Sequence, residues 1–187
     1  PKLSAKDFTE TRRKVVIGMV EGQIITEDKG YAEAVDPDQD ILKMAVVERH
    51  RNTGHIGIGY LQGYGLKRGA VATSVAHDSH NIICVGCNDE DMAFAVNRIA
   101  ENKGGIVVVE NGKVLAELPL EIAGLMTDRP LPEVNDLLEN AKDAAYTLGV
   151  GKGVDPFMTL SFMALPVIPS VRLTTRGVVD VMTQQYI

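Results

Sequence analysis

Short apolar runs separated by turn residues dominate the first half of the chain and predict β-strands. The β-branched residues of 11–20 and 23–26 flank a two-residue turn at Glu21 and Gly22, which predicts a short hairpin. Residues 31–40 are then predicted to form a loop.

Three further strands are predicted, at residues 41–50, 70–76 and 81–86. The first of these also fits a helix, but its paired valines favour a strand. Six glycines lie between Thr53 and Gly69, which is typical of strands that another backbone or a ligand approaches closely. The glycine spacing matches a phosphate-binding loop only loosely, so a nucleotide cradle is not predicted.

Two helices are predicted in the second half of the chain. Residues 89–102 carry apolar residues at helical spacing; Asn88 can cap this helix and Gly104 can end it. A second apolar stripe runs over residues 134–148 and stops at Gly149. Both patterns therefore predict amphipathic helices, each with one buried face.

Strands surround and follow these helices. Residues 105–110 and 113–118 flank the pair Asn111–Gly112, which supplies the positive φ angles of a type I′ turn and predicts a hairpin. Two more strands are predicted over residues 156–169 and 176–185, separated by a proline-bounded turn.

The balance of elements predicts the fold class. The pattern predicts about ten strands but only two helices. Two helices cannot cover both faces of one broad sheet, but each can cover the outer face of one of two stacked sheets. We therefore expect an α/β fold in the broad sense (α+β): two stacked, mainly mixed sheets with a helix on each outer face, an αββα sandwich. A length of 187 residues suits a single domain.

Composition and charge narrow the function classes. The formal net charge is −6 and the basic residues are scattered, which argues against a nucleic-acid partner. The longest apolar runs are interrupted by proline and are shorter than the ~20 residues of a membrane span. Two cysteines and a polar N-terminus without an apolar leader segment predict reduced thiols and a cytoplasmic location. Because residue 1 is proline, we expect that the sequence was cut from a longer chain.

The segment SVAHDSHNIICVGC, residues 74–87, concentrates the candidate chemistry. His77 and His80, with Asp78 between them, are residue types that bind transition metals or transfer protons near neutral pH. The motif lies between two predicted strands, however, where Asp78, Ser79 and Asn81 can instead bond to the backbone of their own turn. Both interpretations remain open at this point.

Other candidates have weaker patterns. Cys84 and Cys87 have C-x-x-C spacing, but residues three apart on a strand face opposite sides, which favours two unpaired thiols. Glu48 and His50 would share one face of a strand as a general-base pair, or form a surface ion pair. The apolar residues that recur five apart near the C-terminus indicate core filling; they are Phe157, Met158, Phe162 and Met163.

Residues 40–183 as a whole resemble the C-terminal domain of the bacterial adenine deaminases of the amidohydrolase superfamily. The resemblance rests on the stretches ILKMAVVERHRNTGHIGIGYLQGYGLKRGAVATSVAHDSHNIICVGCNDEDMAFAVNRI, ELPLEIAGLMTD and PFMTLSFMALPVIPSVRLTTRGVVDV. It implies that residues 1–187 are one C-terminal domain, in which a hairpin within residues 1–30 is carried over from the domain boundary.

The resemblance also implies an activity. The whole enzyme would be a hydrolase that breaks a C–N bond of a cyclic amidine, turning adenine and water into hypoxanthine and ammonia in purine salvage. Manganese or iron would be bound by an N-terminal barrel whose H-x-H motif this chain lacks. We therefore expect no cofactor and no activity in this chain alone; its partners would be that barrel, adenine and a second copy of the protein.

The family resemblance covers the candidate residues as well. His77, Asp78, Ser79, His80 and Asn81 match the family's HDSHN stretch, and residues 48–50 match its E-R-H. This implies that His77, Asp78 and His80 are catalytic candidates that complete or cover the adenine site.

By the same match, Ser79, Asn81, Glu48 and His50 are candidates for substrate binding or for docking the barrel. A non-catalytic oligomerisation module and a free-standing metal site at His77 and His80 remain the alternatives.

Overall fold

The structure is a computed structural model that describes residues 2–10 and 13–187. Its large sheet contains β1 (Lys14–Met19), β2 (Thr26–Ala32), β3 (Leu42–Val47), β4 (Ile56–Gln62), β5 (Ala70–Thr73), β6 (Ile82–Gly86), β7 (Gly105–Glu110) and β8 (Lys113–Pro119). The small sheet contains β9 (Val171–Thr174), β10 (Gly177–Asp180) and β11 (Gln185–Tyr186). The α-helices are α1 (Asp89–Glu101), α2 (Leu131–Thr147) and α3 (Met158–Met163), and the 3-10 helices are η1 (Ala5–Phe8) and η2 (Pro37–Gln39).

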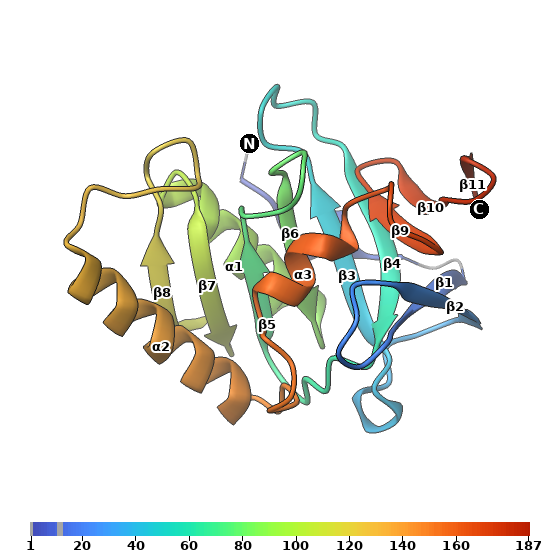
Figure 1. The fold of residues 1–187 in the computed structure, drawn as a ribbon, viewed down its shortest axis with the longest axis horizontal. Helices are drawn as coiled ribbons and strands as arrows, with labels where there is room; N and C mark the ends of the chain where they lie inside the picture. Colours follow the sequence, from blue (N-terminus) through green and yellow to red (C-terminus); the bar gives the residue numbers. More distant parts are fainter. Residues whose placement is uncertain (1, 11–12) are drawn as a thin grey trace.

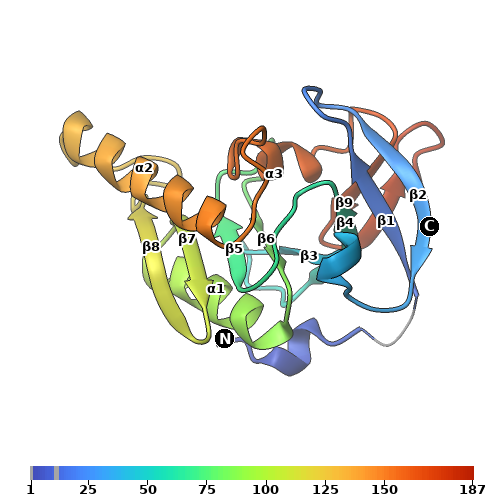
Figure 2. The same cartoon turned by 90° about the horizontal axis from the view of Figure 1, so that it is seen from below.

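The large sheet is mixed, in the order β2-β1-β4-β3-β6-β5-β7-β8. Strands β1 and β4 pair in parallel, and the other neighbours pair antiparallel. Helices α1 and η1 cover one face of this sheet, whereas α2, α3 and the small sheet lie over the other face (Figures 1 and 2). Two apolar cores therefore lie on opposite sides of the same eight strands.

Local signals explain the elements that the sequence predicted correctly. The side chain of Asn88 accepts the N–H of Asp91 at 2.8 Å and so caps α1. The Asp91 carboxylate in turn accepts the N–H groups of Asn111 and Gly112, at 3.1 and 2.9 Å. Both of these turn residues have positive φ, 51° and 69°, as the type I′ prediction requires.

The glycines of β4 allow the two sheets to approach closely. A Cβ atom added at Gly57 would lie 1.8 Å from the carbonyl oxygen of Thr174 in β9, a distance that no real side chain tolerates. A Cβ atom added at Gly59 would likewise lie 3.1 Å from the side chain of Val178 in β10. The predicted close approach of another backbone is therefore confirmed, and that backbone is the small sheet.

The tail contains the main error of the sequence prediction. Residues 156–169, predicted as a strand, contain helix α3, because Asp155 Oδ1 accepts the N–H groups of Phe157 and Met158 and caps a helical turn. The first strand of the tail is β9, which falls in the predicted turn. The second predicted strand, 176–185, is confirmed in its first half as β10, and a turn over residues 181–184 separates β10 from β11.

The first hairpin is confirmed with shifted bounds. Strands β1 and β2 pair antiparallel, but β2 runs over Thr26–Ala32 rather than 23–26, so it enters the predicted loop. Residues 11 and 12 of the predicted strand 11–20 lie outside the described residues.

The predicted fold class is confirmed: the described chain is mixed α/β with two sheets and no closed barrel. The layers are less regular than an ideal αββα sandwich. The small sheet lies beside α3 on the large sheet, and α2 packs directly on β7 and β8 of that large sheet. Three strands are too narrow to cover eight, so helices fill the rest of this layer. Within the described residues, no helix has the length and apolar character to cross a membrane.

The contact at Gly57 gives a test of the sheet packing. We expect Gly57→Ala to lower the free energy of unfolding by about 3 kcal/mol or more, because the added methyl group must push two backbones apart. Urea unfolding monitored by circular dichroism measures this change. Gly153→Ala is the matched control, since a Cβ there meets only a side-chain atom at 3.6 Å. Equal stability of the two variants would contradict the packing described.

Candidate functional site

The HDSHN stretch forms the turn between β5 and β6, at the upper end of the large sheet in Figure 1. The N–H of His77 donates to the carbonyl oxygen of Ser161 in α3 at 2.9 Å, and the N–H of His80 donates to that of Ala76 at 2.6 Å. Because His80 has a φ of 49°, the chain reverses here before entering β6. The turn is thus fixed through its backbone.

The segment after β3 provides the second set of anchors for this turn. Arg49 Nε donates to the carbonyl oxygen of His80 at 2.5 Å, and Arg49 Nη2 donates to that of Ala123 at 2.6 Å. The ring Nε2 of His50 lies 2.6 Å from the carbonyl oxygen of Ser79. Burial lowers the pKa of Arg49. Three loops that are far apart in the sequence therefore meet at one guanidinium group.

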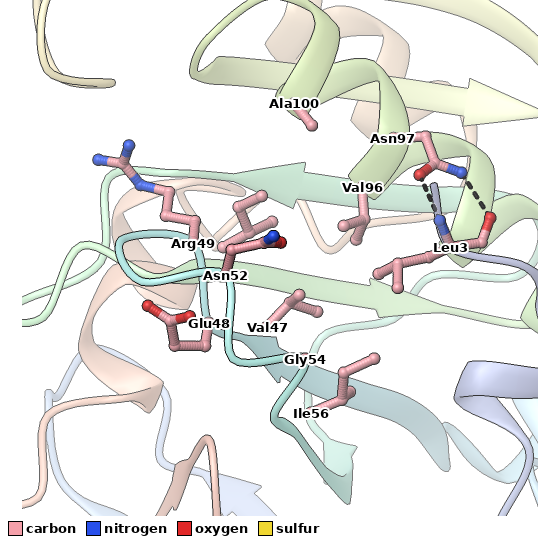
Figure 3. A pocket seen from close by; sticks show the side chains of 11 residues that line it. Leu3, Val47, Glu48, Arg49, Asn52, Gly54, Ile56, Val96, Asn97 and Ala100 are labelled. Carbon is pink, nitrogen blue, oxygen red and sulfur yellow. Dashed lines mark hydrogen bonds between the residues drawn. The ribbon is translucent and has the colours of Figure 1, made fainter. Parts of the chain in front are cut away.

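Glu48 holds the loop from which Arg49 projects. Its carboxylate accepts the N–H groups of His50, Arg51 and Thr53 at 2.6, 2.8 and 3.0 Å, and the Thr53 hydroxyl at 3.1 Å. These bonds lower the pKa of Glu48 to about 2, and the bond from the Thr53 N–H contributes most to this shift. Figure 3 shows the side chains of Glu48 and Arg49 leaving this loop in different directions.

The predicted general-base pair of Glu48 and His50 does not form. The carboxylate binds the backbone N–H of His50, and the ring of His50 binds the turn at Ser79. Strand β3 ends at Val47, so the two-residue alternation of a strand no longer applies at these positions. Both residues instead hold loops of this chain in place, and their docking role stays a prediction.

The anchoring through carbonyl groups leaves the two imidazoles of the turn available for chemistry. Their ring centroids are 6.2 Å apart, and the ring of His77 also contacts Phe162, with centroids 4.9 Å apart. Nδ1 of His80 is buried without a hydrogen-bond partner in the described chain. Burial, followed by the neighbouring charges of His77 and Arg49, lowers the pKa of His80. A lowered pKa favours the neutral form of the His80 imidazole.

The described residues contain no group of three or more His, Cys, Asp or Glu side chains that could hold a metal ion. The two histidines of H-x-x-H come with Asp78, but the structure does not gather these three, or Glu48 and His50, into one ligand set. The residues therefore do not fit the free-standing metal site considered from the sequence.

The C-x-x-C spacing also forms no joint site. Cys84 and Cys87 are both free, and their side chains belong to the apolar cores on opposite sides of the large sheet, as predicted. Burial raises the pKa of both thiols, that of Cys87 to about 11. Two protonated, unreactive thiols result.

A pocket of about 440 Å³ opens beside the HDSHN turn. Asp78, Ser79 and Asn81 form one wall, the segment 164–167 forms another, and Thr174 and Thr175 close the end next to Val46. A smaller pocket of about 160 Å³ lies behind the Glu48 loop, where Asn97 of α1 exchanges two hydrogen bonds with the backbone of Leu3 (Figure 3).

Residues 13–185 match the family described as the adenine deaminase C-terminal domain. This chain belongs to that family. Adenine deaminase 1 of Rhizobium meliloti (strain 1021) is 50% identical to it over 89% of this chain and 30% of its own length. Adenine deaminase of Brucella abortus (strain 2308) is 46% identical, over 97% of this chain and 33% of its own length. Adenine deaminase 2 of Carboxydothermus hydrogenoformans is 47% identical, over 93% and 32%. The chain spans about a third of the length of these curated relatives.

Sequence reasoning placed the HDSHN turn of this adenine deaminase C-terminal domain correctly but missed what surrounds it. The residues it missed are Arg49 as the central anchor, the loop at Ala123 and Gly124, and the apolar segment 164–167. A partial signal exists for Gly124, whose φ is 74° and where a Cβ would meet the Arg49 guanidinium at 2.6 Å. No such signal exists for the walls of the pocket, because the local sequence does not show which distant segments come together.

The lowered pKa of Glu48 predicts a pH dependence. A carboxyl group that titrates near pH 2 when folded and near its ordinary value of 4.5 when unfolded stabilises the domain above pH 4.5, and loses this effect as the pH falls toward 2. We expect Glu48→Gln to unfold at lower urea concentration than the parent chain at pH 7. The gap should narrow steadily below pH 4.5, and a gap that stays constant down to pH 2.5 would contradict the role assigned to this carboxylate.

Proposed function

We propose that this chain is the accessory third of a metal-dependent adenine deaminase and that the end of the fold bearing the HDSHN turn completes or covers the active site. The whole enzyme would convert adenine and water into hypoxanthine and ammonia, a reaction of purine salvage. Manganese or iron would be held by the rest of the enzyme, since the described residues offer no ligand set. We expect the isolated chain to be inactive.

The observation that carries this proposal is the way the turn is held. Arg49 and His50 bind the carbonyl oxygens of His80 and Ser79, so the anchors use the backbone and leave the side chains of the turn for another task. A turn with only a structural role would be expected to use its polar side chains on its own backbone. Here the Ser79 hydroxyl accepts the N–H of Asn81 at a long 3.4 Å, whereas the Asp78 carboxylate is exposed at the rim of a pocket and makes no such bond within the described turn.

The chemistry of the turn suits the leaving group. When water adds to the ring carbon that bears the amino group, the amine must gain a proton before it leaves as ammonia. The imidazole of His80, with Asp78 two residues away in the sequence, can take a proton from the attacking water and deliver it to that nitrogen. In this proposal His77 and His80 act at the leaving group.

The surroundings of the turn support a covering role. Exposed apolar side chains lie in two other loops at the same end of the sheet: Ile122 and Met126 after β8, and Val167 after α3, with exposed fractions of 47%, 56% and 70%. Apolar side chains that rim a polar site are typical of a contact surface. We infer that the metal-binding part of the same polypeptide packs against this surface.

Self-association is the second function considered from the sequence, and one feature favours it. Met182 and Tyr186, 74% and 54% exposed, lie at and just before β11, the edge strand of the small sheet. An exposed apolar edge can pair with a second copy. Sedimentation velocity of the parent chain and of Met182→Lys would show this as a dimer that the substitution dissociates.

A chimera tests the catalytic part of the proposal. The C-terminal third of the Rhizobium meliloti adenine deaminase is replaced by this chain, and ammonia release from adenine is measured. We expect His80→Asn and His77→Asn to lower kcat at least about a hundredfold, as removal of a proton-transfer group does, without lowering the thermal midpoint. His55→Asn, which changes an exposed histidine outside the turn, is the matched control. Unchanged kcat in a folded His80→Asn chimera would contradict a catalytic role.

Hydrogen–deuterium exchange tests the docking part without any substitution. We expect slower amide exchange over residues 77–81, 120–126 and 164–168 in the chimera than in the isolated chain, because the docked barrel excludes water from these loops. The first half of α2, which is largely exposed, is the internal control. Its amides should exchange at the same rate in the chimera and in the isolated chain. Slowing confined to α2 would place the barrel elsewhere.

A further inference from the structure

The pocket beside the HDSHN turn is built from three segments that are separately fixed. Arg49 and His50 hold the wall formed by Asp78, Ser79 and Asn81. The opposite wall, residues 164–167, is followed directly by Ile168 and Pro169, whose carbonyl oxygens accept hydrogen bonds at 2.7 and 3.2 Å from a guanidinium group on β9.

That group belongs to Arg172, which is fully buried and also donates to the carbonyl oxygen of Ile24 at 2.5 Å. Its bonds lock the apolar wall onto the small sheet. The end of the pocket is fixed as well, because the hydroxyl of Thr174 donates to the carbonyl oxygen of Gly177 at 3.1 Å and β9 presses on Gly57. The three lining segments of this open pocket are thus held by contacts within the chain itself, and such preorganisation lowers the entropy lost on binding.

The lining chemistry selects a kind of ligand. Leu165, Pro166 and Val167 supply apolar groups, and Ser79, Asn81 and Thr175 bring groups that can donate and accept hydrogen bonds. Asp78 carries the only charge among the described lining residues, so phosphates and carboxylates are repelled and N–H donors are favoured. The volume of about 440 Å³ falls within the range of roughly 300–1,000 Å³ typical of small-molecule sites.

We propose that this pocket is a binding site for a free purine base, which the domain binds on its own, with one face of the base against Leu165 and Pro166 and its N–H groups toward Asp78. That adenine is the base rests on the proposed function. The site lies within this chain and so adds to whatever contacts the catalytic part makes. It would hold the base at the surface where the two parts of the enzyme meet.

Isothermal titration calorimetry of this chain with adenine tests the proposal. We expect saturable binding of one adenine, and weaker binding of adenosine 5′-monophosphate, whose phosphate meets the charge of Asp78. Asp78→Asn should weaken adenine binding about tenfold, because the charged acceptor is lost. Ser79→Tyr should abolish binding by filling the pocket. Asp143→Asn, at an exposed carboxylate on α2, is the control and should bind as the parent does.

Each contrary result has a definite meaning. A folded chain that does not bind adenine, or whose binding survives both Asp78→Asn and Ser79→Tyr, overturns the site. Equal affinity for adenine and for adenosine 5′-monophosphate overturns the assignment to a free base. If the activity of the chimera depends on His80 while the isolated chain binds no adenine, the proposed function stands and this inference fails. If the isolated chain binds adenine while the activity of the chimera does not depend on His80, this inference stands and the catalytic part of the proposed function fails.

Discussion

The guanidinium group of Arg49 is the contact on which the arrangement of loops at the HDSHN end of this domain depends. It joins the loop after β3, the turn between β5 and β6 and the loop after β8, through the carbonyl oxygens of His80 and Ala123. Because arginine offers five donors in a rigid planar fork, one side chain can hold two loops at defined positions, which the single flexible ammonium of lysine cannot do equally well. Glu48 orients the loop that carries it, and Gly124 leaves the space it needs.

A second constraint, the backbone contact between Gly57 and Thr174, places the small sheet over β4 and so brings β9 to the same end of the molecule. The pocket exists because these two constraints act together: the first fixes its polar wall, and the second fixes its far end. Arg172 supplies the remaining anchor from a fully buried position. The eight-stranded sheet is the rigid support that holds these three contacts, at Arg49, Gly57 and Arg172, in fixed positions.

Much of this fold could be predicted where the signal is local. Helix α1 has its cap at Asn88 and its apolar stripe, and the turn at Asn111 and Gly112 carries its own conformational requirement. Helix α3 could not be predicted in this way, because a short apolar run between prolines fits a strand as well as a helix, and the cap at Asp155 decides between them.

In the candidate site, too, local features could be predicted from the sequence and long-range contacts could not. The position of His77 and His80 on a turn followed from the strands on either side, but the partners of that turn did not. Predicting the pair of Glu48 and His50 required β3 to continue past Val47, and it ends there. The walls of the pocket come from residues 46, 78–81, 164–167 and 174–175, and only the folded chain brings such distant segments together.

In the function proposed above, this chain is necessary to an adenine deaminase whose chemistry it cannot perform alone. Ammonia release from adenine with added manganese tests it most directly, for three samples: this chain, the Rhizobium meliloti relative cut before its C-terminal third, and the chimera of the two. We expect activity for the chimera and none for either part. Ammonia release by this chain alone, or full activity of the shortened relative, would contradict it.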